Sequence, residues 1–195
     1  LIYRPDCFRV TESCNICVSD TTAGFYTRDI LLVGGVLADK DTCYFLVNHW
    51  PSKLGGATAD HYRMQIARRL LLTMDSLQRI HPAALVLAMG DFNASAEEAA
   101  ISKGLGFGHG QYNEQGFYNL MYGIAKGTGS YKYQDSWSCI DQIISNRQLE
   151  VEIFRPEFML IDDSKYLGKK ILRTYSGMRY LGGYSDHLPI IATLK

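Results

Sequence analysis

Two short motifs place polar side chains next to apolar segments. Asp91 and Asn93 follow the apolar run of residues 83–89, and Asp186 and His187 precede another apolar segment. Residues two apart on an extended chain point to the same side, so Asp91 and Asn93 could act together on a metal ion, a water or a phosphate oxygen. An Asx turn and a solvated surface pair are the competing structural explanations. Taken singly, each motif is weak evidence for function.

Two further polar residues stand inside or at the end of apolar segments. Asp141 interrupts an apolar strand, where a carboxylate without a partner costs on the order of several kcal/mol to bury, and a histidine is a natural donor to it. His49 closes another apolar strand and could reach the same surface as Asp91, although a structural histidine is the alternative. Together, acid, amide and imidazole groups at four strand ends are the set needed for metal-assisted attack of water on a phosphoester.

The elements that must position these groups begin with short strands. Alternating or continuous apolar residues bounded by turn residues predict three strands, and the break at residues 39–41 predicts an antiparallel hairpin between the second and third. The three strands cover Phe8–Val18, Ile30–Leu37 and Cys43–Val47.

A long helix is predicted next, from Ala59 to Ile80, because its apolar residues recur at helical spacing. Thr58 or Asp60 is the expected cap, Arg63 is expected on the polar side with most of the other charged residues, and Pro82 lies just past the end. The run of residues 83–89 that follows is too short for a second long helix and is predicted to be a buried central strand.

The rest of the chain predicts shorter elements. Residues 95–103 are typical of a short capped helix, and glycine-rich residues 104–129 are expected to form loops over the site. Strand character returns at residues 137–146 and 189–194, whereas residues 162–170 are too short a linker to separate two domains. The expected architecture is a layered α/β sandwich in a single domain of residues 1–195.

Composition limits the function classes. Lysine plus arginine and aspartate plus glutamate both number 20, so no global charge attracts nucleic acid or an anionic membrane. The five cysteines favour free thiols, and Cys14 and Cys17 lack the second ligand pair of a zinc knuckle. No apolar run is long enough for a membrane span, so no stable membrane insertion is expected, while the compartment and the oligomeric state stay open.

One group of basic residues supports either of two interpretations. They could assemble a local basic rim, with Tyr131, Tyr133 and Trp137 available to stack on bases, or they could form a solvated loop, which the sequence favours. The group comprises Lys126, Lys132, Lys165, Lys169, Lys170, Arg173 and Arg179.

The polar motifs, taken in order, resemble the endonuclease/exonuclease/phosphatase superfamily, which includes pancreatic deoxyribonuclease, apurinic endonucleases, neutral sphingomyelinases and inositol-phosphate phosphatases. The resemblance runs from Tyr3 to the carboxyl terminus and is closest to a bacterial branch. It implies the deoxyribonuclease-like α/β/β/α sandwich. The motifs that carry it are Asn48-His49, Gly90-Asp91-Phe92-Asn93, Ile140-Asp141-Gln142-Ile143 and Ser185-Asp186-His187.

The resemblance also implies roles for individual residues. Asp91 would position or activate the attacking water, and Asn93 would hold that water or a phosphate oxygen. Asp141 would orient His187, which would act on the nucleophile or the phosphate, while His49 would bind phosphate and stabilise or protonate the leaving oxygen. Asp186 would lie at the metal, and Arg28 is a weaker candidate for phosphate contact. The metal would be Mg²⁺, with Mn²⁺ as an alternative, because the ligands are hard oxygens.

One departure from the family pattern concerns the metal. The metal-binding glutamate of the family precedes the segment that begins at Tyr3, so the chain is expected to be the carboxyl-terminal two-thirds of the domain and to bind metal poorly alone. The preferred function is a magnesium-dependent phosphodiesterase, phosphatase or nuclease. A small or lipid-derived phosphoester is slightly preferred over nucleic acid as its substrate. The alternative is a noncatalytic binding or scaffold protein that keeps the fold.

Overall fold

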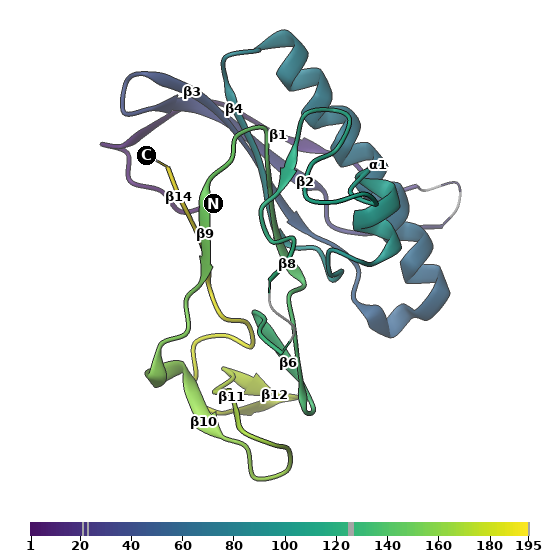
Figure 1. The fold of residues 1–195 in the computed structure, drawn as a ribbon, viewed down its shortest axis with the longest axis vertical. Coiled ribbons are helices and arrows are strands. Elements are labelled where there is room, and N and C mark those ends of the chain that lie inside the picture. The colour runs from purple at the N-terminus through teal and green to yellow at the C-terminus, as the bar shows by residue number, and fades with distance from the viewer. Residues whose placement is uncertain (21, 23, 125–126, 195) are drawn as a thin grey trace.

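A six-stranded mixed sheet forms the centre of the computed structural model, which describes residues 1–195 apart from residues 21, 23, 125, 126 and 195 (Figure 1). The strands lie in the order β1-β2-β3-β4-β8-β5. Their bounds, with that of the long helix α1, are β1 (Phe8–Ile16), β2 (Ile30–Leu37), β3 (Asp41–His49), α1 (Gly56–Ile80), β4 (Leu85–Asp91), β5 (Tyr118–Asn119) and β8 (Asp141–Ser145).

The remaining elements are short and mostly paired in two-stranded ladders. The ladders are β6–β7, β9–β14, β10–β11 and β12–β13. The strand bounds are β6 (Tyr131–Tyr133), β7 (Ser136–Ser138), β9 (Glu150–Ile153), β10 (Leu160–Asp162), β11 (Lys169–Ile171), β12 (Tyr175–Ser176), β13 (Arg179–Tyr180) and β14 (Ile190–Thr193). Single helical turns occur at η1 (Lys53–Gly55), η2 (Ala100–Gly104) and η3 (Glu157–Met159).

The connections explain the direction of each strand. The β2–β3 hairpin is antiparallel, as predicted, and its turn places Ala38 and Asp39 at φ values of 48° and 56°. β3 and β4 are parallel, because α1 carries the chain back to the starting edge before β4 begins. β8 then runs antiparallel to β4. The strands predicted at residues 30–37 and 83–89 are therefore confirmed, the latter as the central strand β4.

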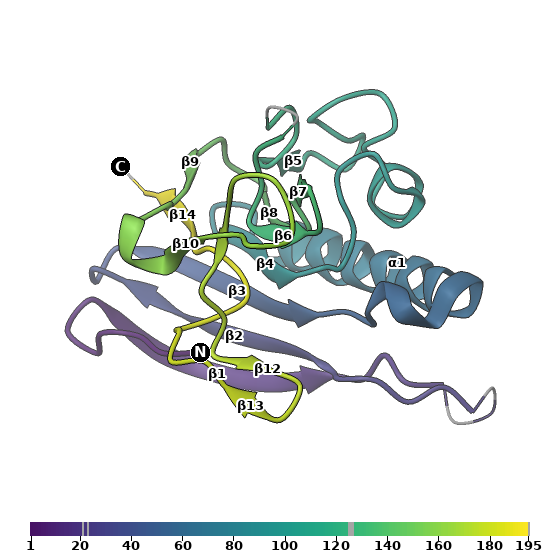
Figure 2. The ribbon, with the colours of Figure 1, turned by 90° about the horizontal axis from the view of Figure 1, so that it is seen from below.

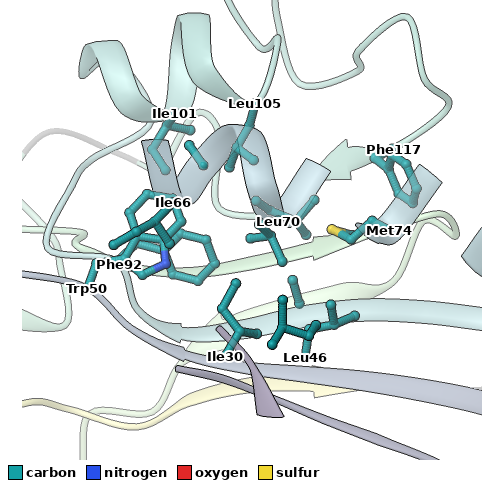
Figure 3. Packing of buried hydrophobic residues seen from close by; sticks show 14 of the residues in the cluster. Ile30, Leu46, Trp50, Ile66, Leu70, Met74, Phe92, Ile101, Leu105 and Phe117 are labelled. Atoms are coloured by element: carbon teal, nitrogen blue, oxygen red, sulfur yellow. The ribbon is translucent and has the colours of Figure 1, made fainter. Parts of the chain in front are cut away.

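Alternating side chains divide the core between the two faces of the sheet. On one face, Leu46 and Val86 pack under α1, where Ile66, Leu70 and Met74 are fully buried (Figure 3). On the other face, β9 and β14 cover a second cluster (Figure 2). That second cluster includes Phe8, Val33, Cys43, Leu85, Leu87 and Ile143. The arrangement confirms a layered α/β fold with a large central sheet.

The start of α1 corrects two expectations. The helix begins at Gly56 after Gly55 and has no side-chain cap, so Thr58 and Asp60 lie inside the helix rather than capping it. Arg63 is buried instead of facing solvent. Its guanidinium donates a hydrogen bond of 2.8 Å to the carbonyl of Pro51 and pairs with Asp60, and these partners compensate its burial. Arg63 thereby ties α1 to the segment that follows β3.

Residues 95–119 also differ from expectation. Instead of an ordinary α-helix over residues 95–103, the regular part is the π-helical turn η2, and Glu98 accepts a 3.0 Å hydrogen bond from the amide of Ser95. The following loop packs on α1 rather than over the site, because Phe107 and Phe117 belong to the core beneath it. Figure 3 shows Phe117 beside Met74.

Two further segments are more divided than predicted. Residues 137–146 contain the end of β7 and the whole of β8, and residues 162–170 contain the turn of the β10–β11 hairpin together with parts of both its strands. All five cysteines are free, as the odd count predicts. Burial, together with the charges of Asp141 and Glu97, raises the pKa of Cys139 to about 12, so this thiol is not a nucleophile at neutral pH.

Among the described residues, no helix is long and apolar enough to cross a membrane.

Candidate active site

Three adjacent strands place one predicted site residue each in a single row across the sheet. His49 at the end of β3 pairs in register with Asp91 at the end of β4, and Asp91 pairs with Asp141 at the start of β8. Gly90 allows this approach, because a Cβ atom there would lie 2.1 Å from the carbonyl oxygen of Asn48 and its φ is +133°. The row is thus set by strand register.

The turn after β4 brings Asn93 back onto Asp91. The expected extended conformation does not persist, because Asn93 has a φ of 48°. The backbone amide of Asn93 instead donates to Asp91 Oδ1 at 2.8 Å, and its side-chain amide donates to Asp91 Oδ2 at 3.1 Å and to the carbonyl of Trp50 at 3.0 Å. These bonds hold the Asp91 carboxylate in one orientation.

His187 completes the cluster from a loop distant in sequence. Its Nδ1 lies 2.7 Å from Asp141 Oδ2, and because a carboxylate only accepts hydrogen bonds, Nδ1 carries the proton. The hydroxyl of Ser130 donates to the same carboxylate oxygen. The amide of Leu188 donates to the carbonyl of Ser130 at 2.7 Å, and the ring of Tyr131 lies 4.8 Å from that of His187. His187 is therefore held by β6 and by β8.

The second nitrogen of His187 faces Asp91. Its Nε2 is 3.9 Å from Asp91 Oδ2, and Nε2 of His49 is 3.6 Å from the same oxygen. The side chains of Asp91 and His187 are 20% and 21% exposed, while that of His49 is 51% exposed. Asp91 is thus flanked by two imidazoles, of which His49 is the more accessible to a bound molecule.

Burial and neighbouring charges shift the titration of this cluster. Burial raises the pKa of Asp91, as does the charge of Asp141, although the amide of Asn93 and both histidines lower it. Burial alone would lower the pKa of His187, but the hydrogen bond and charge of Asp141, with the charges of Asp91 and Asp186, raise it overall. The pKa values of Asp91 and of His187 are thus both raised, and such shifts are common among residues of functional sites.

Two predicted site residues lie apart from this row. Asp186 is exposed, and although its charge acts on His187, it lines a neighbouring cavity with Lys132 and Arg173. Arg28 is exposed on an open groove that it shares with Pro51 and Ser52. The structure therefore brings together His49, Asp91, Asn93, Asp141 and His187.

A metal ion would have few protein ligands here. Within the described part of the chain, no three His, Cys, Asp or Glu side chains are grouped so that they could hold one ion. Mg²⁺ can nevertheless bind through one or two carboxylates when water and substrate phosphate supply its other ligands. Asp91 has the required donor chemistry, and a nearby cation would favour its ionised form.

Several residues of the site escape sequence reasoning. Ser130, which donates to Asp141, was not singled out from the sequence. Tyr131 was considered only for stacking on bases, whereas its ring lies against His187. The carbonyl of Trp50 fixes Asn93, and backbone groups leave no trace in a sequence pattern.

Comparisons with known proteins identify one family. The family described as "Endonuclease/Exonuclease/phosphatase family" matches residues 1–195. No curated protein matches the chain in sequence.

Three examples illustrate the likeness of the fold to solved structures. A humanized D. rerio TDP2 superposes with a TM-score of 0.58 at 18% identity, covering 97% of this chain and 68% of that one. A mannosyl-6-phosphatase of Bacteroides thetaiotaomicron gives 0.62 at 17% identity, covering 98% and 69%. The human Nocturnin catalytic domain gives 0.55 at 13% identity, covering 96% and 61%. At such identities the likeness concerns the fold alone.

Proposed function

This chain belongs to the endonuclease/exonuclease/phosphatase family, and on that premise we propose that it hydrolyses a phosphoester with His187 as general base. The observation that carries the proposal is the position of His187 between two carboxylates. Asp141 lies 2.7 Å from Nδ1, and Asp91 lies 3.9 Å from Nε2. An imidazole so held has one nitrogen protonated and the other free to accept a proton.

The attacking group would be a water between His187 and Asp91. Atoms 3.9 Å apart are too distant for a direct hydrogen bond, yet both can bond to one shared water. His187 Nε2 takes a proton from this water as its oxygen forms a bond to phosphorus. The phosphorus–oxygen bond to the leaving group then breaks, and the charge of Asp141 stabilises the imidazolium.

The other residues of the row would act on the phosphate. His49 is half exposed beside Asp91, so it would bind a phosphate oxygen and donate a proton to the leaving oxygen. Asn93 keeps Asp91 in place, and its side-chain amide is suited to a phosphate oxygen as well. Arg28, on the groove beside Pro51, is proposed as a more distant phosphate contact.

A divalent cation would assist this chemistry. Members of the family generally use divalent metals, and we propose Mg²⁺, with Mn²⁺ as an alternative, held by Asp91 together with water and substrate oxygens. Asp186, which lines the neighbouring cavity, is the further ligand that the family resemblance implies. When bound, the ion would neutralise charge that develops on the phosphoryl oxygens.

The substrate is proposed to be a small phosphoester. Residues 1–195 are proposed to form one domain. The equal number of acidic and basic residues, 20 of each, argues against long nucleic acid. Both α1 and the β9–β14 ladder pack on the same sheet, which supports a single domain. Among the similar structures are a mannosyl-6-phosphatase and a D. rerio TDP2 complexed with a single-strand DNA product, so both kinds of substrate belong in the test.

A substrate panel tests the proposal. The protein is assayed with Mg²⁺, with Mn²⁺ and with EDTA on bis-p-nitrophenyl phosphate, p-nitrophenyl phosphate, abasic DNA and sphingomyelin. We expect hydrolysis of at least one of these with Mg²⁺, and a loss of at least about tenfold with EDTA, because the cation contributes to charge stabilisation in the transition state.

The result also separates an enzyme from a binding protein. Equal, background-level rates for the wild type and for His187→Ala on all four substrates would refute the hydrolase and favour a noncatalytic protein with this fold. A rate that is unchanged by EDTA would refute the metal requirement alone.

A further inference from the structure

A second cavity adjoins the candidate active site. Its volume is about 360 Å³, at the lower end of the range of about 300–1,000 Å³ typical of small-molecule sites. It is formed largely by β6 and by the β10–β11 and β12–β13 segments, which lie together at the end of the molecule away from α1 (Figure 1). Its charged lining residues are Lys132, Lys165, Lys170, Arg173, Asp163 and Asp186.

A stack of side chains connects this cavity to the catalytic histidine. The guanidinium carbon of Arg173 lies 5.4 Å from the ring centre of Tyr131, and that ring lies 4.8 Å from the ring of His187. Tyr131 and His187 are also joined by a backbone bridge. Asp186, the neighbour of His187, contributes to the cavity wall. A molecule bound in the cavity would therefore lie close to the site of hydrolysis.

The cavity holds positive charge that the described carboxylates do not fully neutralise. Lys170 pairs with Asp163 at 3.2 Å. Lys132, only 6% exposed, instead donates to the carbonyl of Leu167 at 2.6 Å, and Arg173 donates to the carbonyl of Lys132 at 3.2 Å.

Among the described residues, no ion pair joins Lys132 or Arg173 to an acidic group. A buried cation without a counter-charge is costly, and a bound anion would reduce that cost. Asp186 is the one further carboxylate on the wall, so four cations face two acidic groups.

We infer that this cavity binds a second phosphate group of the substrate, which is then a small molecule with two phosphates. One phosphate is hydrolysed between Asp91 and His187, and the other is bound by Lys132 and Arg173. The inference rests on the proposed function for the first phosphate. Arginine is suited to the second, because its guanidinium can donate two parallel hydrogen bonds to phosphate oxygens.

The structure favours such a molecule over a nucleic-acid strand. A strand requires an extended groove with repeated cations and stacking surfaces, whereas here the cations surround one cavity. Of the basic rim considered from the sequence, Lys169 pairs with Glu157, Arg179 does not line the cavity, and Lys126 lies outside the described residues. Only part of the predicted basic rim is therefore assembled, and that part lines the cavity.

Binding to a catalytically disabled protein tests this inference. The protein with His187→Ala is titrated calorimetrically, in the presence of Mg²⁺, with α,ω-alkanediol bisphosphates of increasing length and with the matching alkyl monophosphates. Varying the length avoids any assumption about the distance between the two phosphates. We expect at least one bisphosphate to bind about tenfold or more tightly than its monophosphate, as one additional charged hydrogen-bonded contact would provide.

Variants of the cavity assign the difference to it. Adding Arg173→Met should bring the ratio of the two affinities close to one, and adding Lys165→Met, at an exposed position, should reduce it in part. Lys132→Met completes the set. Because Lys132 is buried, this variant could misfold, and the test therefore depends on the variants at Arg173 and Lys165, which are more accessible. Lys40→Met, in the β2–β3 turn, is the matched control and should leave the ratio unchanged.

Equal affinities for every pair, or a ratio that survives Arg173→Met, would overturn the inference. It would also be overturned if single-stranded DNA bound more tightly than every bisphosphate and lost that advantage with Arg173→Met. Because His187→Ala measures binding without turnover, a failed hydrolase assay of the wild type and a failed binding ratio are separate results.

Discussion

Asp91→Asn is expected to lower kcat/KM for phosphoester hydrolysis by at least about 10³-fold, the combined size of acid–base and electrostatic contributions in such sites. The substitution preserves the shape of the side chain but removes the charge that faces Nε2 of both His49 and His187. Initial rates on the substrates that the wild type hydrolyses measure the effect.

The same substitution should not destabilise the fold. Burial raises the pKa of Asp91, so its ionised form costs stability above the unfolded pKa of about 3.9. The neutral amide of the Asp91→Asn variant carries no such cost, and the melting temperature at neutral pH should be equal to or higher than that of the wild type. This advantage should disappear in acid, as the wild-type carboxylate becomes protonated.

Asp39→Asn provides the matched control for the loss of a carboxylate. Asp39 is exposed in the β2–β3 turn at a φ of 56°, a conformation that asparagine tolerates. Its activity should remain that of the wild type. An Asp91→Asn protein with more than a tenth of the wild-type rate would contradict a catalytic role for Asp91.

His187→Ala should lower kcat by about 10²–10⁴-fold, the range for a general base, whereas Asp141→Asn should change the pH dependence as well as the rate. The base must be neutral, so the wild-type rate should rise with pH through the raised pKa of His187. Burial alone would lower this pKa, and the hydrogen bond from His187 to Asp141 is the first of the contributions that raise it. Asp141→Asn should therefore move the acidic limb of the pH–rate profile to lower pH.

Stability should follow the same linkage. Because the folded pKa of His187 is raised, its protonation stabilises the fold fully below the unfolded pKa of about 6.5, and this contribution is lost as pH rises through the folded pKa. Asp141→Asn should thus reduce the free energy of unfolding more near pH 6 than near pH 9. His109→Ala, at an exposed loop position, is the control for loss of an imidazole. An unmoved acidic limb in Asp141→Asn would argue against His187 as the base.

Much of the framework that carries the site was accessible from the sequence. The apolar runs before Asp91 and before His49 predicted strands, and polar residues at the ends of apolar strands indicated a shared surface. The pattern of apolar residues locates strands and helices, because the side chains that these elements bury must be apolar. Strand order and register were not accessible, since they depend on contacts between β3, β4 and β8 that are distant in the chain.

The remaining differences have local physical causes. Arg63 was expected on the polar side of α1, but its hydrogen bond to Pro51 compensates its burial. Asn93 adopts a left-handed conformation that side-chain hydrogen bonds to Asp91 stabilise, which periodicity does not reveal. Arg28 and Asp186 lie in loops without a periodic sequence pattern, so the sequence did not show that each lines a hollow beside the site.

A double-mutant cycle at Asp91 and His187 tests the central claim most directly. The rates of the wild type, Asp91→Asn, His187→Ala and the double variant are measured on one phosphoester with Mg²⁺. If both residues act on one water, the double variant should be about as slow as the slower single variant, because each substitution alone already disables the unit. The account would be contradicted if the loss of rate in the double variant equalled the product of the losses in the two single variants. It would also be contradicted if the single variants were as active as the wild type.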